Sequence, residues 1–357
     1  MIPVTKSFLP DQELYQSFVQ RAFDNGWLTN RGELVLELEK KLKDHLTTEQ
    51  LLITNNGTAP LQIALKLFAK DAEVITTPFS YVATTSSIVW EGATPVFVDI
   101  EPDTWTIDPH KIEGAITSNT KAILATHVFG NPCDIEAIQM IAKKHQLKVI
   151  YDAAHCFDVK YQGQSIFNFG DVSTCSFHAT KLFHTGEGGA IFTKDPALFH
   201  EIYYSHNFGH NGPLAFHGLG INAKISELQV ALGLAVLPSI NKIISERKSI
   251  VGQYKQLLDQ DHLQLIKLRD HTDWNFSYFP VVFESEEKLL AVEEALNKAE
   301  IYPRRYFYPS LNKLPYLDYQ AMPIAESISE RILCLPLYVG LTSDEVAQIC
   351  ELINNHL

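Results

Sequence analysis

The stretch LLITNNGTAPLQIALKLF, residues 51–68, shows the pattern that decides the fold. A short apolar run, LLIT, leads into the polar turn NNGT. The segment after the turn has apolar residues at helical spacing: Leu61, Ala64, Leu65 and Phe68. A buried strand followed by an amphipathic helix is the repeating unit of a parallel sheet. The sequence therefore predicts that residues 51–68 form one strand–helix unit.

The same alternation continues along the chain to about residue 195. Further β-branched runs occur in EVITTP (73–78), TPVFVDI (94–100), KAILATHVFG (121–130), KVIYDAA (148–154), VSTCSFH (172–178) and GGAIFTKD (188–195). Between two of them, Asp134 can cap a helix that ends in Lys143, Lys144 and His145. Strands that alternate with helices predict an α/β fold with a mostly parallel sheet covered on both faces.

The pattern becomes helical after about residue 222. Two apolar-periodic segments, 225–237 and 239–258, flank Pro238, which we expect to kink or break the helix. A strand is expected at 277–283, and helices at about 285–298 and 342–355. A chain of 357 residues suits one large and one smaller domain. We predict a large domain at 1–245 and a small α+β domain at 246–357, with the boundary inside a long helix.

Composition excludes several classes of function. The chain has 29 Lys and Arg against 42 Asp and Glu, a formal charge of −13, which disfavours binding to nucleic acid or to an anionic membrane. The five cysteines are scattered and form no CxxC pair, so neither a metal site nor a disulfide framework is expected. The beginning, MIPVTKSFLPDQE, does not resemble a signal peptide, and no apolar run spans a bilayer. We therefore expect a soluble, cytoplasmic protein.

Two residues carry the chemistry that the sequence suggests. Asp152 ends an apolar strand run, and strand carboxyl ends border the ligand crevice of open α/β sheets. Lys181 lies between a strand and the turn Gly186–Gly189, whose glycines allow positive φ or close backbone approach. Ser176 and Lys181 flank a short connection, so a hydroxyl could bind a phosphate and an amine could bind an aldehyde in one pocket. Taken singly, a helix-capping or turn aspartate and a solvated surface lysine are the simpler reading of these two residues.

Four further residues fit a phosphorylated, flat ligand. Gly57 and Thr58 open a helix, where free N–H groups and the helix dipole favour a phosphate, although helix capping alone also explains them. Tyr81 could stack on a ring and His155 could contact a ring substituent, although core positions are the simpler reading of both. No GxGxxG motif follows a strand, which argues against a Rossmann dinucleotide site.

The order and spacing of these residues resemble a known family, the DegT/DnrJ/EryC1/StrS sugar aminotransferases, which are fold type I enzymes that use pyridoxal phosphate. The resemblance covers nearly the whole chain. It is carried by these blocks: GWLTNRGELVLELEKKL (26–42), NGTAPLQIAL (56–65), TTPFSYVATTSSIVWEGATPVFVDI (76–100), HVFGNPCDIEAI (127–138), VIYDAAHCF (149–157), CSFHATKLFHTGEGGAIFT (175–193), GLGINAKISELQVALGL (218–234) and LCLPLYVGLTSDEV (333–346).

The resemblance implies a role for each candidate residue. Lys181 would be the Schiff-base lysine, and Asp152 would keep the pyridine nitrogen protonated, which the cofactor needs to act as an electron sink. The phosphate would be held by Gly57, Thr58 and Ser176. Tyr81 would stack on the ring, and His155 would contact its phenolic oxygen. Asn222 would reach the phosphate of a neighbouring subunit, which implies a homodimer with shared active sites.

The resemblance also implies the reaction. The donor would be L-glutamate, and the acceptor a nucleotide-linked 4-keto-6-deoxyhexose, most similar to dTDP-4-keto-6-deoxyglucose, for lipopolysaccharide O-antigen biosynthesis. The candidates for binding this substrate are Arg31, Lys224, Arg304, Arg305 and Tyr308. Amination at C3 of a ketosugar and a non-catalytic, nucleotide-sugar-binding regulator of the same fold remain open as alternatives. A sugar dehydratase of this family would have histidine in place of Lys181.

Overall fold

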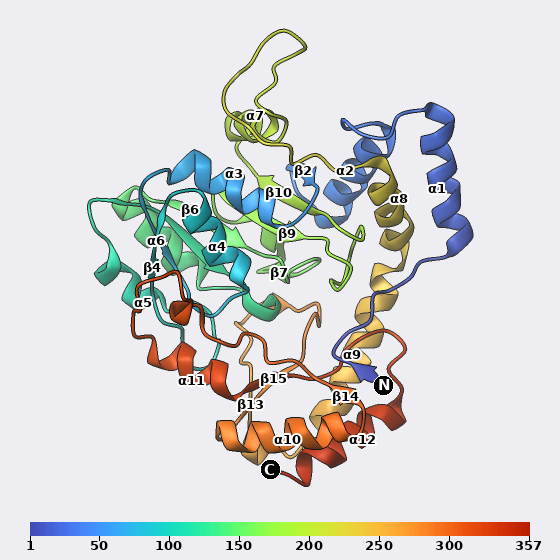
Figure 1. Ribbon diagram of the computed structural model, residues 1–357, viewed down its shortest axis with the longest axis vertical. Helices are drawn as coiled ribbons and strands as arrows, with labels where there is room; N and C mark the ends of the chain where they lie inside the picture. Colours follow the sequence, from blue (N-terminus) through green and yellow to red (C-terminus); the bar gives the residue numbers. More distant parts are fainter.

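The computed structural model describes residues 1–357. Its centre is a seven-stranded sheet with the order β2-β10-β9-β6-β5-β3-β4 (Figure 1). Only β10 runs antiparallel to its neighbours. The strands are β2 (Gln50–Thr54), β3 (Glu73–Thr76), β4 (Thr94–Phe97), β5 (Thr120–Thr126), β6 (Lys148–Asp152), β9 (Val172–Ser176) and β10 (Gly189–Thr193). The predicted α/β fold with a mostly parallel sheet is confirmed.

Alternation along the strands builds a separate core on each face of the sheet. Leu124 and Ile150 pack against helices on one face, whereas Ile123 and Val149 pack on the other. The first face carries α3 (Thr58–Phe68), α4 (Val82–Trp90) and α7 (Pro196–Ser205). The second carries α2 (Glu33–Leu46), α6 (Ile135–His145) and α8 (Glu227–Val236). As predicted, Asp134 caps α6, since its carboxylate accepts the Ala137 N–H at 3.0 Å.

Smaller elements complete this part of the chain. Helix α1 (Gln12–Asn25) packs along α8, and α5 (Pro109–Ile112) is a single turn. A three-stranded sheet joins β12 (Thr272–Asp273), β7 (Lys160–Tyr161) and β8 (Gln164–Ser165). The chain between α7 and α8 projects as a long loop at the top of Figure 1.

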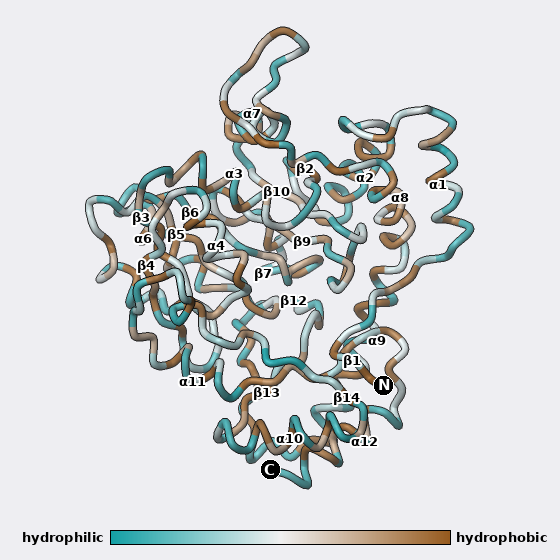
Figure 2. The backbone as a smooth tube through the Cα atoms, viewed as in Figure 1, coloured by the Kyte–Doolittle hydropathy of each residue, from teal (hydrophilic) through white to brown (hydrophobic).

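The C-terminal part is smaller and has its own core. A three-stranded sheet, β11 (Leu263–Leu265), β13 (Pro280–Phe283) and β15 (Ile332–Cys334), packs with α10 (Glu286–Lys298), α11 (Pro323–Arg331) and α12 (Ser343–Asn354). The first strand, β1 (Ile2–Pro3), pairs in parallel with β14 (Ile301–Tyr302), so the start of the chain belongs to this part. In Figure 2 the hydrophobic colour runs along β5 in the large sheet and β13 in the small one.

Helix α9 (Ile240–Leu257) connects the two parts. Ile240 and Ile243 lie in the core beneath the large sheet, whereas Val251 and Tyr254 lie in the C-terminal core. The division that we propose at residue 245 falls between these two sets. Pro238 lies in a 3₁₀ turn, η4 (Leu237–Ser239), where α8 ends and α9 begins.

One helical stretch, Glu227–Leu257, is long and apolar enough to cross a membrane by length and composition alone. Such a stretch is weak evidence, because the core helices of soluble proteins have the same properties. Here 44% of its most apolar window is buried inside the protein. Val230, Leu234 and Val236 pack in the core of the large sheet, which accounts for the apolar composition.

Candidate active site

The carboxyl ends of the parallel strands meet at one edge of the large sheet, and a cavity of about 250 Å³ lies there. Asp152 is the last residue of β6, and Ser176 is the last residue of β9. Eight residues that the sequence singled out line this cavity: Gly57, Thr58, Tyr81, Asp152, His155, Ser176, Lys181 and Arg304. Residues from five separate segments of the chain therefore meet at this edge of the sheet.

Asp152 is a buried carboxylate whose two oxygens are held by different partners. Thr84 donates its hydroxyl to Oδ2 at 2.7 Å, and the Ala154 N–H donates to Oδ1 at 3.1 Å. Burial raises the pKa of Asp152, while these two hydrogen bonds and the charge of Lys181 act to lower it. A cationic or N–H partner in the cavity would relieve the burial cost, so the site favours a protonated ring nitrogen.

Lys181 approaches the cavity from a loop that the local sequence shapes. The loop closes through Ala179 N–H to the Gly186 carbonyl at 2.7 Å, and Gly186 has a φ of +79°, which favours glycine. The Lys181 ammonium donates to the hydroxyl of Tyr278 at 3.1 Å. Tyr278 immediately precedes Phe279 and β13, so the C-terminal part supplies this partner.

The start of α3 and the end of β9 form a cradle for an anion. Gly57 lies so close to Ser176 that a Cβ atom at Gly57 would be 2.7 Å from the Ser176 Cβ. Asn56 caps α3 by accepting the N–H groups of Thr58 and Ala59, both at 2.8 Å. The Gly57 N–H and the Thr58 hydroxyl have no partner in the protein. They lie at the positive end of the helix dipole, a combination that suits a phosphate.

His155 is held as one neutral tautomer. Its Nδ1 accepts the backbone N–H of Phe129 at 3.1 Å, so in the neutral ring the proton is on Nε2. Burial lowers the pKa of His155 well below its usual value, and the charge of Lys181 adds to the effect. Because His155 lines the cavity, it offers an N–H donor there.

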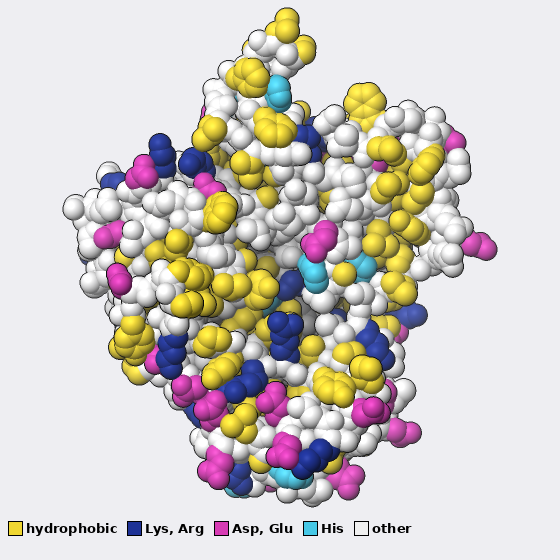
Figure 3. All heavy atoms as spheres, in the orientation of Figure 1, with side chains coloured by type: hydrophobic (Ala, Val, Ile, Leu, Met, Phe, Trp, Pro, Cys, Tyr) yellow, Lys and Arg dark blue, Asp and Glu magenta, His cyan; other side chains and the backbone are white.

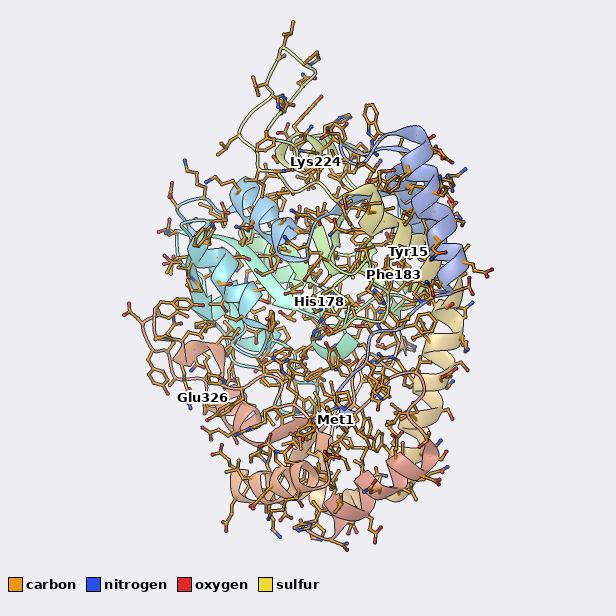
Figure 4. All side chains as sticks on the ribbon, turned by 45° about the vertical axis from the view of Figure 1, so that its right-hand side comes forward. Met1, Tyr15, His178, Phe183, Lys224 and Glu326 are labelled. Carbon is orange, nitrogen blue, oxygen red and sulfur yellow. The ribbon has the colours of Figure 1, made fainter.

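Five of the predicted residues do not line this cavity. Lys224 donates a hydrogen bond to the side chain of Asn222 at 2.8 Å. In Figure 4, Lys224 lies at the base of the projecting loop. His178, which lines the cavity, lies near the centre of the same view. Arg31 pairs with the buried Glu39 at 2.6 Å. Arg305 pairs with Glu286 at 2.6 Å and its guanidinium covers the ring of Tyr308.

Sequence reasoning missed several residues at the site. Tyr278, Tyr306 and Phe307 line the cavity from the C-terminal part, and Thr84 supports Asp152 from behind. No local motif marks Tyr278, which is far from Lys181 in sequence. Thr84 lies in the run TTSS, where only its position on the buried side of a helix could have distinguished it.

The residues present fit pyridoxal phosphate. The cavity offers an amine, a buried carboxylate, an imidazole N–H donor and unpartnered phosphate donors, one for each polar group of that molecule. Its volume of about 250 Å³ is several times the ~30 Å³ of one water molecule. Tyr81, 53% exposed, borders the open side, where an aromatic ring can stack on the ligand.

Comparison with known proteins agrees with this reading. Residues 11–354 match the model of the DegT/DnrJ/EryC1/StrS aminotransferase family. The dTDP-4-amino-4,6-dideoxy-D-glucose transaminase of Escherichia coli is 38% identical and covers 99% of this chain and 98% of its own length. The protein of the same name from Shigella dysenteriae is 40% identical, covering 98% and 97%. The crystal structure of DesI, solved in the presence of its TDP-sugar product, is 31% identical with a TM-score of 0.93, covering 99% and 92%.

Proposed function

The chain belongs to the DegT/DnrJ/EryC1/StrS aminotransferase family and is an enzyme that uses pyridoxal phosphate, and from this premise we propose that it transfers the amino group of L-glutamate to C4 of a dTDP-linked 4-keto-6-deoxyglucose. The single observation that carries the proposal is the placement of Lys181 and Asp152 on one cavity, with a phosphate cradle between β9 and α3. The expected product is dTDP-4-amino-4,6-dideoxyglucose.

We assign each polar group of the cofactor to residues of the chain. Gly57, Thr58 and Ser176 would hold the phosphate, Asp152 would accept a hydrogen bond from the ring nitrogen, and the Nε2–H of His155 would donate to the phenolic oxygen. When bound, pyridoxal phosphate supplies an aldehyde that carries the amino group and a ring that withdraws electrons. The residues orient this ring and keep its nitrogen charged.

Lys181 is the proton carrier in the proposed mechanism. When neutral, its amine would move a proton between the substrate carbon that bears the nitrogen and the cofactor carbon on the other side of that nitrogen. The hydroxyl of Tyr278, 3.1 Å from the Lys181 Nζ, would hold the amine in place. Tyr278 would therefore limit the positions that the amine can take in the cavity.

A nucleotide-linked sugar needs cations for its diphosphate. Within one chain the cations that line the cavity are Lys181 and Arg304, and we assign the substrate's negative charge to Arg304. The relatives from Escherichia coli and Shigella dysenteriae support a dTDP-linked 4-amino product by their names. We also propose that this product is used in lipopolysaccharide O-antigen biosynthesis, as the sequence resemblance implies.

We propose a homodimer in which each subunit completes the other's site. Large apolar side chains are exposed on the projecting loop and near α1 and α4; Leu214 is 96% and Trp90 80% exposed. Figure 3 shows hydrophobic side chains gathered at the tip of the loop. Patches of this kind mark protein interfaces. Asn222 and Lys224, at the base of the loop, would then reach the neighbouring cavity. We also propose a cytoplasmic location, where nucleotide sugars are made.

The experiment that tests the proposal separates the two half-reactions. Glutamate first converts the purified protein to its aminated cofactor form, which is followed by absorbance. The protein is then mixed with dTDP- and GDP-linked 4-ketosugars and with a 3-ketosugar, and NMR identifies the carbon that receives nitrogen. Return of the aldehyde form only with the 3-ketosugar would refute C4 amination and favour the alternative substrate. No conversion with glutamate would refute the donor.

A further inference from the structure

Three hydroxyl groups form a buried chain that ends on Asp152. Thr84 Oγ1 lies 2.7 Å from Asp152 Oδ2, Ser80 Oγ lies 2.7 Å from Thr84 Oγ1, and Thr126 Oγ1 lies 3.0 Å from Ser80 Oγ. All four side chains are buried, with exposed fractions of 5% or less. Ser80 and Thr126 line the cavity, whereas Thr84 does not. Thr84 therefore acts on the site only through Asp152.

The number of protons that each group can donate fixes the direction of the three hydrogen bonds. An ionised carboxylate only accepts, so the single proton of Thr84 points to Asp152. Thr84 must then accept from Ser80, and Ser80 must accept from Thr126. All three hydroxyl dipoles thus align toward the negative charge, and aligned bonds strengthen one another in a low-dielectric interior.

We propose that Thr84, oriented by Ser80 and Thr126, is a positioning residue that keeps Asp152 ionised and so sets how tightly the protein holds the ring nitrogen of its cofactor. The inference rests on the proposed role of Asp152. It concerns a different property, the hydrogen bond that the carboxylate accepts from Thr84, a residue that does not line the cavity.

The neighbouring groups explain why a charge-neutral support is needed. The titratable groups around Asp152 are Lys181, His155 and the buried thiols of Cys156 and Cys175. Burial keeps His155 neutral and raises the pKa of both thiols, so Lys181 is the one cation in the set. The mechanism requires the Lys181 amine to lose its charge. The hydroxyl chain supports the carboxylate whether or not Lys181 is protonated.

The test compares two ligands that differ at one ring atom. Pyridoxamine phosphate binds without a covalent bond, and its analogue with carbon in place of the ring nitrogen cannot be protonated there. Dissociation constants are measured by fluorescence titration for the wild type, Thr84→Val, Thr84→Ser and the control Thr85→Val. Thr85 is also buried on α4, and its hydroxyl has no partner. Circular dichroism confirms that each variant is folded.

We expect Thr84→Val to weaken pyridoxamine phosphate binding by roughly tenfold or more, the loss typical of one hydrogen bond to a charge. Binding of the carbon analogue should change less than about twofold by the same reasoning. Thr84→Ser and Thr85→Val should bind both ligands as the wild type does. Ser80→Ala, one bond further from the carboxylate, should show a smaller loss than Thr84→Val.

Two results would overturn the proposal, and they are distinguishable. If the wild type does not prefer the nitrogen-containing ligand, then Asp152 lacks its proposed role and the inference fails with it. If the wild type discriminates and Thr84→Val keeps the same ratio between the two ligands, only the role of Thr84 is refuted. If Thr84→Val weakens the binding of both ligands equally, the role of Thr84 is also refuted, because an equal loss of affinity indicates a general change in packing.

Discussion

Replacing Gly57 by alanine tests whether the contact between α3 and β9 shapes the phosphate cradle. Gly57 has φ −80° and ψ −10°, a backbone conformation that alanine adopts readily. Any effect of Gly57→Ala must therefore come from steric overlap of the added Cβ atom with its neighbours. The added Cβ would lie 2.7 Å from the Ser176 Cβ and 3.0 Å from both its Cα and its Oγ.

The size of the effect follows from these distances. Carbon atoms in contact prefer about 3.5–4.0 Å, so the two segments must separate by roughly 1 Å. Overpacking of this kind costs about 1–3 kcal/mol. Because the displaced groups are those that hold the phosphate, we expect the affinity for pyridoxal phosphate to fall by about tenfold or more, since 1.4 kcal/mol corresponds to a factor of ten.

The assay is the dissociation constant of pyridoxal phosphate, measured by absorbance together with the melting temperature. The control is Gly252→Ala in α9, where an added Cβ meets nothing within 4 Å. The double variant Gly57→Ala, Ser176→Gly removes two of the three close atoms and should relieve the strain within the cradle. Wild-type affinity and melting temperature in Gly57→Ala would refute the reasoning.

Four other perturbations give separate tests. Lys181→Ala should abolish transamination while the protein stays folded; measurable turnover would show that another group carries the proton. Asp152→Asn should slow both half-reactions by orders of magnitude in stopped-flow absorbance, and a near-normal rate would mean that the ring nitrogen has another partner. Lys181→Ala chains mixed with Asn222→Ala chains should regain activity if the sites are shared, and proven mixed dimers without recovery would contradict that arrangement. Burial lowers the pKa of His127 to about 3, so between pH 6 and 4 the unfolded chain binds a proton that the folded chain excludes. The free energy of unfolding should therefore fall by about 1.36 kcal/mol for each pH unit of acidification because of this group. When the free energy of unfolding is measured by urea titration at several pH values, its dependence on pH should be smaller by about one proton in His127→Asn, and an unchanged dependence would assign the acid sensitivity to another group.

Local patterns predicted most of the large sheet because each strand–helix unit is encoded within one short stretch. The runs around β2, β5 and β6 and the Asp134 cap need only period-two or helical spacing to be recognised. The predicted strand at 277–283 is shorter in the structure, where β13 spans 280–283. Ser277 instead donates its hydroxyl to the His155 carbonyl at 2.9 Å, so a contact with the site replaces the sheet pairing.

The site was less predictable where its parts come from distant segments. Asp152 and Ser176 lie at strand ends and Lys181 in the loop that follows β9, where topology alone gives a pocket its residues. Tyr278 reaches Lys181 from the C-terminal part of the chain, and no spacing in the sequence encodes that contact. Thr84 is missed for a different reason: its role depends on a hydrogen bond between two buried residues, which hydrophobic periodicity cannot show.

The pairing of β10 with both β2 and β9 has a consequence for how the protein acquires its cofactor. β2 leads to Gly57 and β9 ends at Ser176, and only the insertion of β10 between the two strands fixes them in one sheet. Contacts between segments this far apart in the chain form late, since closing long loops is entropically costly. A phosphate thus finds its binding groups assembled only on a nearly finished molecule. Binding of the cofactor therefore stabilises the nearly complete fold and does not assist the early steps of folding.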